Sequence, residues 1–265
     1  MLKSVSVSQP QKQKFKTIVH NHVWLMLALD DLKMRYKRSL IGPFWIVIHA
    51  AVQISAIAFV FSNLFGVDMR VFLPYLASGI VIWQFIAAVI AESPHIFLES
   101  QGLIISYNLP NSTYIKRFLT RHVIVLAHNF LIFVAVCFIY PQPLNWNTLL
   151  LLAGLPLMIF NAYHLAVIFA IIGTRYRDFS QAVAAMILVT FMITPVFWDK
   201  GLLKTETWIA LVNPFFHYIE IIRNPLLGKP VAPLSWAVVL GVSTLIYIAS
   251  KIIYKKYHSR FTYWF

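Results

Sequence analysis

The stretch at positions 44–65 contains no acidic or basic side chain, and four cations lie just before it within positions 33–38. A helix rises about 1.5 Å per residue, so roughly 20 residues cross the hydrocarbon core of a bilayer. Counted from Gly42, the stretch is long enough to do so. Moving four cations across a membrane is costly, and we therefore expect this end of the first span to stay in the cytoplasm.

Composition extends this conclusion to the whole chain. The 265 residues are 60% apolar and 12% charged, with a mean hydropathy of +0.73, whereas an ordinary globular domain is about 25% charged. The sequence therefore predicts an all-α polytopic integral membrane protein, with a cytoplasmic segment at 1–38 and a single transmembrane domain at 39–265. Six apolar runs are expected to span the membrane: 42–65, 73–91, 118–140, 149–172, 179–198 and 234–253.

The distribution of charge predicts the topology. The chain has 22 Lys and Arg residues and a net charge of +13, which by itself would suit nucleic acid or anionic lipid as a partner. Most of these cations lie on alternate flanks of the apolar runs, a positive-inside pattern that puts both termini in the cytoplasm. We therefore expect no nucleic-acid partner. The basic flanks are 1–38, 93–121, 175–177 and 251–260.

The segment 15–32 has the pattern of an amphipathic helix. Apolar residues recur there at three- and four-residue steps, from Phe15 and Ile18 to Met26 and Leu29, with lysines beside them. Such a helix suits the headgroup layer of the cytoplasmic leaflet. Packing of the same face on the protein itself is the alternative.

The segment 200–233 contains two apolar pieces that are too short to span a membrane, separated by Asn213-Pro214. Pieces of this length beside a membrane predict an outer re-entrant helical hairpin between the fifth and sixth spans. Glu220 and Arg223 lie one helical turn apart in this segment. We expect them to form a structural ion pair.

The sequence contains no motif with which the chain would drive transport by itself. A phosphate-binding loop ends in Gly-Lys-Ser/Thr, but the only Gly-Lys pair, at Gly228-Lys229, is followed by Pro230. The six runs carry no Asp, Glu, Lys or Arg near their centres, which argues against coupling to protons or sodium and leaves three histidines, His49, His128 and His164, as the titratable residues at depth. No carboxylate pair or His-Asp group converges in one loop, which disfavours an embedded glycosyl- or acyltransferase. We expect no metal site and no cofactor in this chain.

Four motifs follow one another along the chain: RYKRSLIGPFW at 35–45, GLI at 102–104 with Leu109-Pro110 behind it, RYRD at 175–178, and PVF at 195–197 with Asn213-Pro214 behind it. With these motifs the chain resembles, over almost its whole length, the permease subunit of a family of ABC exporters. Those exporters move bacterial polysaccharides such as O-antigen, capsule or teichoic acid out of the cytoplasm.

The resemblance implies a homodimer that encloses a channel in the cytoplasmic (inner) membrane of a bacterium, with two copies of a separate ATPase subunit that binds the ATP. It implies export of a lipid-linked polysaccharide, first of all lipopolysaccharide O-antigen, with teichoic acid, capsule, or a small lipid or drug as alternatives. The segment after the second span would dock into the ATPase as a coupling segment. Its residues are Asn108, Leu109, Pro110, Asn111, Ser112 and Tyr114.

Aromatic residues make up 15% of the chain and bear on the substrate. Sugar rings present C–H faces that lie well on aromatic rings, so a channel with such rings lets a glycan slide. Aromatic side chains also fill membrane cores and form belts at both interfaces, which is the alternative. The candidates for lining the channel are Trp45, Phe59, Phe61, Trp83, Phe191 and Phe197.

Polar side chains near and inside the spans also allow two interpretations. Arg35, Lys37 and Arg38 fix the topology, and they are candidates for attracting the pyrophosphate of a lipid-linked glycan, because a planar guanidinium suits phosphate. Four amides within the runs can hydrogen-bond between helices or face a pore, and we expect the first. These amides are Gln53, Gln84, Asn129 and Asn161.

Overall fold

The computed structural model describes residues 9–37, 39–42, 44–107, 109–198, 207–257 and 264. Within these ranges every regular element is a helix, which confirms the expected all-α fold. The elements are α1 (Gln9–Tyr36), α2 (Phe44–Phe65), α3 (Met69–Glu92), η1 (Ser93–His95), α4 (Ile96–Glu99), α5 (Gln101–Ser106), α6 (Asn111–Ile139), η2 (Trp146–Leu150), α7 (Leu151–Arg175), α8 (Phe179–Ile193), α9 (Thr207–Val212), α10 (Pro214–Leu226) and α11 (Pro233–Tyr257).

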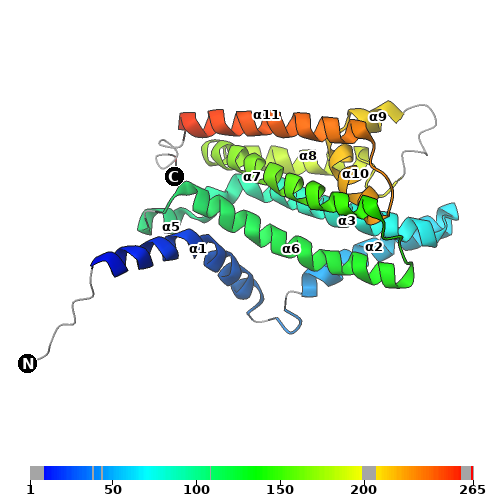
Figure 1. Cartoon of the computed structure of the whole chain (residues 1–265), viewed down its shortest axis with the longest axis horizontal. Helices are drawn as coiled ribbons and strands as arrows, with labels where there is room; N and C mark the ends of the chain where they lie inside the picture. Colours follow the sequence, from blue (N-terminus) through cyan, green and yellow to red (C-terminus); the bar gives the residue numbers. More distant parts are fainter. Residues whose placement is uncertain are drawn as a thin grey trace, which may run out of the picture.

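The helix α3 forms the centre of the bundle. It packs against α2, α6, α7, α8 and α10, and the longest helices run roughly along the long axis of the molecule (Figure 1). In the helical stretch Met69–Ser106, 67% of the most apolar window is buried, against 17% in α2 and 17% in α11. Apolar faces that are left exposed to this extent suit a surrounding of lipid rather than water.

Five helical stretches in the described part of the chain are long and apolar enough to cross a membrane. They coincide with five of the six predicted runs, to within two residues where a run extends beyond its helix. The remaining run, 179–198, forms α8, which has only 15 residues and rises about 22 Å. Residues 194–198 then continue as a non-helical segment whose first three residues are buried. The count of six spans stays a prediction, because α8 by itself is shorter than a full span.

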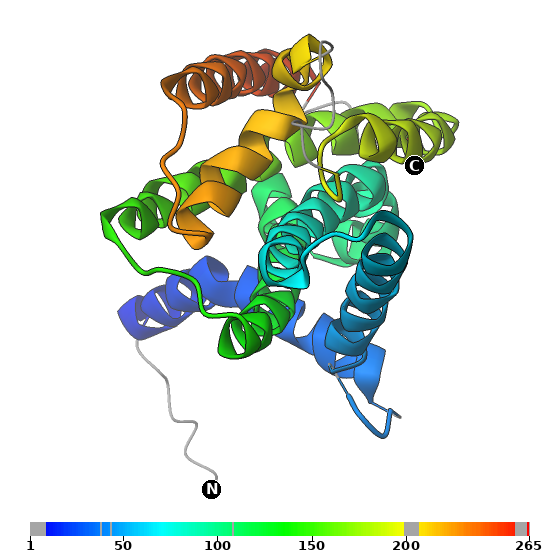
Figure 2. The same ribbon diagram turned by 90° about the vertical axis from the view of Figure 1, so that its right-hand side faces the viewer.

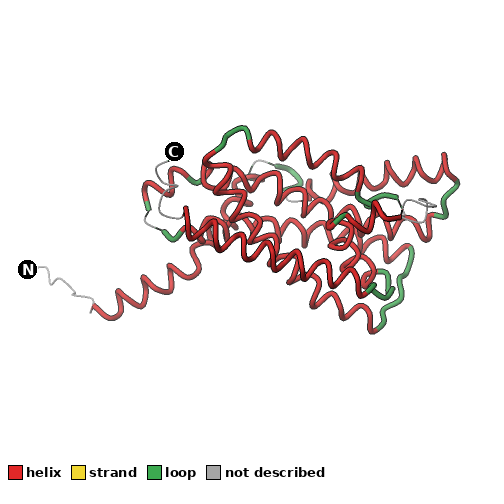
Figure 3. Tube along the Cα trace, turned by 90° about the horizontal axis from the view of Figure 1, so that it is seen from above, coloured by secondary structure: helices red, strands yellow, loops and turns green. Residues whose placement is uncertain are grey.

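The helix α1 is longer than the predicted amphipathic segment and projects from one end of the bundle, which we call the α1 end (Figures 1 and 3). Its second half packs against α6, and Ala28 is fully buried there. Met26 and Met34 on the same helix are 62% and 66% exposed. The helix therefore packs on the protein and keeps an apolar surface, and its location in the headgroup layer stays a prediction.

Two helices, α9 and α10, occupy the predicted hairpin region between α8 and α11. Asn213 separates them: its side chain accepts a hydrogen bond of 2.9 Å from the Phe215 backbone N–H, and Pro214 follows it at the first helical position. Both features favour the start of a helix. The helix α10 packs against α3, α7 and α11, and most of its middle is buried. The re-entrant course through the membrane stays a prediction.

At the α1 end, α7 and η1 approach each other closely at Gly173. A Cβ atom at this position would lie 2.5 Å from the Pro94 Cβ and 2.6 Å from the Pro94 Cα. Carbon atoms in contact are normally about 3.5–4.0 Å apart. Glycine thus allows the turn that follows α3 to lie directly on α7, and this contact positions the short helices α4 and α5.

Candidate functional site

Aromatic side chains from α2, α3, α8, α10 and the segment that follows α8 form a continuous set of ring contacts, which we call the aromatic cluster. Phe61 stacks on Phe72 at a centroid distance of 5.3 Å and contacts Phe197 at 6.0 Å. The rings continue through Phe191 to Trp83, with centroid distances of 5.2 and 5.6 Å. Distances of 4.5–7 Å are typical of favourable aromatic pairs. The cluster consists of Phe61, Phe65, Phe72, Trp83, Phe191, Phe197 and Phe215.

The cluster unites four of the six predicted channel residues, namely Phe61, Trp83, Phe191 and Phe197. The other two lie on the exposed side of α2, with Trp45 51% and Phe59 68% exposed. The cluster also contains Phe65, Phe72 and Phe215, which the sequence analysis did not select. All three stand in or beside aromatic-rich apolar runs, where nothing in the local pattern separates them from other aromatic residues. A channel-lining role for the cluster stays a prediction.

Amide side chains form a chain of hydrogen bonds across three helices. Gln84 of α3 donates to Gln53 of α2 at 2.9 Å, and Asn129 of α6 donates to Gln84 at 3.0 Å. On the other side of the bundle, Asn161 of α7 donates to Ser243 of α11 at 2.7 Å. The expected interhelical role of the four amides is therefore confirmed. Each such bond contributes about 0.6–2 kcal/mol within a membrane.

Arg223 of α10 connects three elements at the end opposite to α1, and we call this arrangement the Arg223 latch. The side chain is 1% exposed and donates to the carbonyl oxygens of Pro195 and Val196 at 2.9 and 2.8 Å. Its guanidinium carbon also lies 3.9 Å from the centre of the Tyr75 ring on α3. A buried cation is costly unless it is hydrogen-bonded in this way. The latch thus ties the segment after α8 to α3 and α10.

Glu220, one turn before Arg223, binds a different element. Its Oε2 atom accepts a hydrogen bond of 3.0 Å from Ser235 at the start of α11, and the His217 Nδ1 atom lies 2.9 Å from the same hydroxyl. Glu220 and Arg223 therefore hold two different neighbours of α10, and a direct ion pair between them stays a prediction.

Charged side chains connect α1 to α6 and α3 at the α1 end. The Arg117 guanidinium of α6 binds the Asp31 carboxylate of α1 with both ends of its fork, and the Nε–Oδ2 distance is 2.6 Å. These side chains are only 19% and 12% exposed. One turn further on, Arg121 lies 2.9 Å from Glu92, the last residue of α3. Charged side chains at the start of α6 are therefore bonded to both α1 and α3.

Reversing the Asp31–Arg117 pair is expected to separate its contribution from that of neighbouring charges. Asp31→Arg and Arg117→Asp should each lower stability by about 2–4 kcal/mol, because each leaves a half-buried charge opposed by a like charge. The double variant should recover more than half of the loss. Asp30→Arg is the control, since Asp30 is 59% exposed and its contact with Lys33 is 3.8 Å long. Thermal unfolding in detergent measures all four, and additive losses would contradict the pairing.

The predicted coupling segment lies partly on the surface and partly inside. Pro110 is exposed and Asn111 and Ser112, the first residues of α6, are half-buried, whereas Tyr114 is 1% exposed. Tyr114 is thus a packing residue in this conformation. Leu109 is half-buried, and Asn108 lies outside the described residues. The adjacent α5 instead presents Ile105, 74% exposed, and Tyr107 just beyond it, 60% exposed. The sequence analysis did not select these two.

Of the predicted pyrophosphate-attracting cations, Arg35 lies in the last turn of α1 and Lys37 lies directly after this helix. Arg35 and Lys37 are exposed and, with Met34 and Ser39, line a depression in the surface. Arg38 lies outside the described residues. Among the described residues, no group of three or more His, Cys, Asp or Glu side chains is placed to hold a metal ion.

A bundle of apolar helices of membrane-spanning length, with charged side chains at one end, defines a multi-pass membrane protein, and its family match identifies it as a transport subunit. Residues 23–227 match the family described as ABC-2 type transporter, and the chain belongs to this family. Two relatives from Klebsiella pneumoniae are each described as "O-antigen export system permease protein RfbA". One is 24% identical over 197 residues, 72% of this chain and 74% of the relative. The other is 23% identical over 219 residues, 77% of this chain and 81% of the relative.

Proposed function

We propose that this chain is the permease subunit of an ABC exporter that moves a lipid-linked polysaccharide, first of all lipopolysaccharide O-antigen, across the bacterial inner membrane. The observation that carries the proposal is the match to the ABC-2 family together with the similarity to two O-antigen export permeases over most of their length. Because the sequence lacks a phosphate-binding loop, ATP is hydrolysed by a separate subunit. Both termini lie in the cytoplasm.

The permease acts as a homodimer, and α2 and α8 of the two copies face each other. Both helices lie on the same side of α3 (Figure 2), and both expose apolar side chains such as Val52 of α2 and Leu188 of α8, 63% and 64% exposed. The aromatic cluster joins α2, α3 and α8 on this side. In the dimer it borders the path along which the glycan slides, with its rings against the C–H faces of the sugars.

Two copies of the ATPase subunit dock at the α1 end. When ATP binds, the ATPase subunit moves and presses on the exposed surface of α5 and on the segment leading into α6, which includes Pro110 and Asn111. The Asp31–Arg117 pair transmits the movement from α6 to α1, and hence to Arg35 and Lys37 at the start of the first span. There the cations, together with Arg38, attract the pyrophosphate of the lipid-linked glycan from the inner leaflet.

ATP hydrolysis by the complex of this chain with its ATPase subunit, reconstituted in vesicles, tests the proposal. A lipid-linked glycan is expected to stimulate hydrolysis, and lipophilic drugs are not. Replacing Arg35 and Arg38 with Gln should raise the glycolipid concentration for half-maximal stimulation about tenfold, since a hydrogen bond to a charged group contributes about 1.5–3 kcal/mol.

Lys229→Gln is the control, because Lys229 is an exposed cation near the opposite end of the bundle. It should leave the glycolipid response unchanged. Stimulation by drugs without any response to the glycolipid would refute the polysaccharide assignment, and an unchanged response in the arginine variants would refute the role of the cations.

A further inference from the structure

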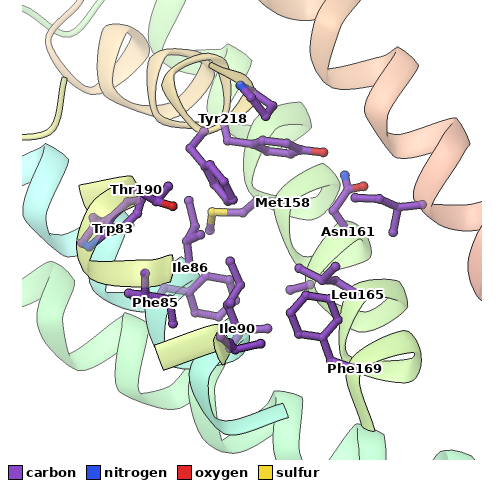
Figure 4. Close-up of a pocket in the computed structure, with 18 of the residues that line it drawn as sticks. Trp83, Phe85, Ile86, Ile90, Met158, Asn161, Leu165, Phe169, Thr190 and Tyr218 are labelled. Carbon is purple, nitrogen blue, oxygen red and sulfur yellow. The ribbon is translucent and has the colours of Figure 1, made fainter. Parts of the chain in front are cut away.

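A cavity of about 330 Å³ lies among α3, α7, α8, α10 and α11. Figure 4 shows its wall, to which α3 and α7 contribute most of the labelled side chains. On α7 the lining extends from Met158 to Phe169, a rise of about 16 Å along the helix. The cavity is therefore longer than it is wide. Central lining residues are Ile86, Ile90, Met158, Leu165 and Phe169.

The polar donors of Thr190 and Asn161 at the edge of the cavity bond to partners in the protein, whereas the buried Asn161 Oδ1 atom has no hydrogen-bond partner in the described part of the chain. The Thr190 hydroxyl donates to the Met186 carbonyl at 2.7 Å, and the Asn161 amide donates to the Leu157 carbonyl and to Ser243, both at 2.7 Å. The wall is otherwise apolar. Water in a cavity needs two to four polar partners, and sugar hydroxyls have the same requirement. The cavity thus suits a hydrocarbon rather than water or a glycan.

The opening of the cavity lies in the membrane-embedded part of the protein. Its walls include α3, α7 and α11, which have the length and composition of membrane spans. Met186 of α8 lines the cavity and is 67% exposed, so the cavity is open to the surroundings beside α8. At this depth those surroundings are the acyl chains of the bilayer. The cations at 35 and 37 belong to α1 and the turn after it, which do not line the cavity. This separation favours an ordinary membrane lipid over the substrate as the source of the chain.

We propose that this cavity binds one acyl chain of a membrane phospholipid, which packs between α8 and the α7–α11 pair. The helix α8 packs mainly against α3, and the Arg223 latch holds the segment that follows it. The acyl chain supplies the apolar contacts that α8 lacks on its other side. Bound lipid thereby supports α8 in the position seen here, and the proposal does not depend on the identity of the transported substrate.

Quenching of tryptophan fluorescence by lipids with brominated acyl chains tests the proposal. Trp83 lines the cavity but is only 6% exposed, so bulk lipid does not reach it whereas a chain inside the cavity does. The intact chain and its Trp83→Phe variant are compared in vesicles of brominated and of ordinary phosphatidylglycerol. The difference in emission between the intact chain and the variant is the contribution of Trp83. This difference should be present in ordinary vesicles and lost in brominated ones. Equal Trp83 emission in both kinds of vesicle would overturn the proposal.

Filling the cavity provides the second measurement. Ala162→Phe adds a ring to the cavity wall, and Ala237→Phe adds the same ring to an exposed position of α11 as the control. Native mass spectrometry should find one phospholipid per chain in the purified protein and in the control, and its loss in Ala162→Phe. Retention of the lipid in Ala162→Phe would overturn the proposal. So would a cavity filled only by an isoprenoid lipid or by a side chain of a second copy.

Discussion

Gly79→Ala is expected to destabilise the protein by about 3–5 kcal/mol, because it displaces the Arg223 latch. A Cβ atom at position 79 would overlap the Arg223 Nη2 atom and lie 2.6 Å from the Val196 carbonyl oxygen. Both atoms belong to the same hydrogen bond, so neither can move without breaking it. A buried cation separated from its acceptors costs several kcal/mol. Thermal unfolding of the purified protein in detergent measures the loss.

The control for this variant is Gly241→Ala on α11. No atom lies within 4 Å of a Cβ atom at position 241, and alanine is favoured over glycine inside a helix by about 0.5–1 kcal/mol. Gly241→Ala should therefore be neutral or slightly stabilising. If Gly79→Ala unfolds at the same temperature as Gly241→Ala, the latch does not contribute to stability as described. Gly79→Ala should also impair ATP-driven transport by the assembled complex, because this substitution releases the segment after α8 from α10.

Gly173→Ala is expected to cost about 3 kcal/mol at the α1 end. The added Cβ atom would overlap the Pro94 carbonyl and lie 2.5 Å from the Pro94 Cβ. These atoms are backbone or rigid ring atoms, so a change of rotamer does not relieve the collision. The turn η1 must move away from α7 and take α4 and α5 with it. Forced overpacking of this kind typically costs 1–3 kcal/mol and occasionally more.

Gly102→Ala is the matched control, since Gly102 lies on α5 at the same end and a Cβ atom there would have no neighbour within 4 Å. It should leave the unfolding temperature within a few degrees of the parent protein. For Gly173→Ala we expect a lower unfolding temperature and faster cleavage by protease in the 93–107 region. Identical proteolysis of the two variants would show that η1 does not depend on close contact with α7.

Local patterns in the sequence predicted the helical class and six apolar runs, five of which correspond to helical stretches of membrane-spanning length. Runs such as 42–65 and 118–140 are recognisable from composition alone. A helix that crosses a bilayer needs about 20 consecutive residues that are predominantly apolar. The sequence also predicted that the side-chain amides of Gln53, Gln84 and Asn129 form hydrogen bonds between helices. Polar side chains inside a span seek partners on neighbouring helices, although the sequence does not say which partner each one finds.

The length of α8 was less accessible to such reasoning. The run 179–198 has the composition of a span, but the helix ends at Ile193, and the residues that follow it form bends in which Arg223 donates to two carbonyl groups. The residues after this ending accept hydrogen bonds from a residue about 30 positions further along the chain. Composition within a window contains no information about such a partner.

The sequence by itself determined that the chain lies in a lipid bilayer, that it is helical and where its apolar runs are, because these properties follow from the hydropathy of consecutive residues. Only the tertiary structure decided which side chains meet. It brought Phe61 to Phe197, Gly79 to Arg223 and Gly173 to Pro94. Such contacts join residues that are 79 to 144 positions apart, and they depend on how helices pack in three dimensions, where a single methyl group decides whether two elements can approach.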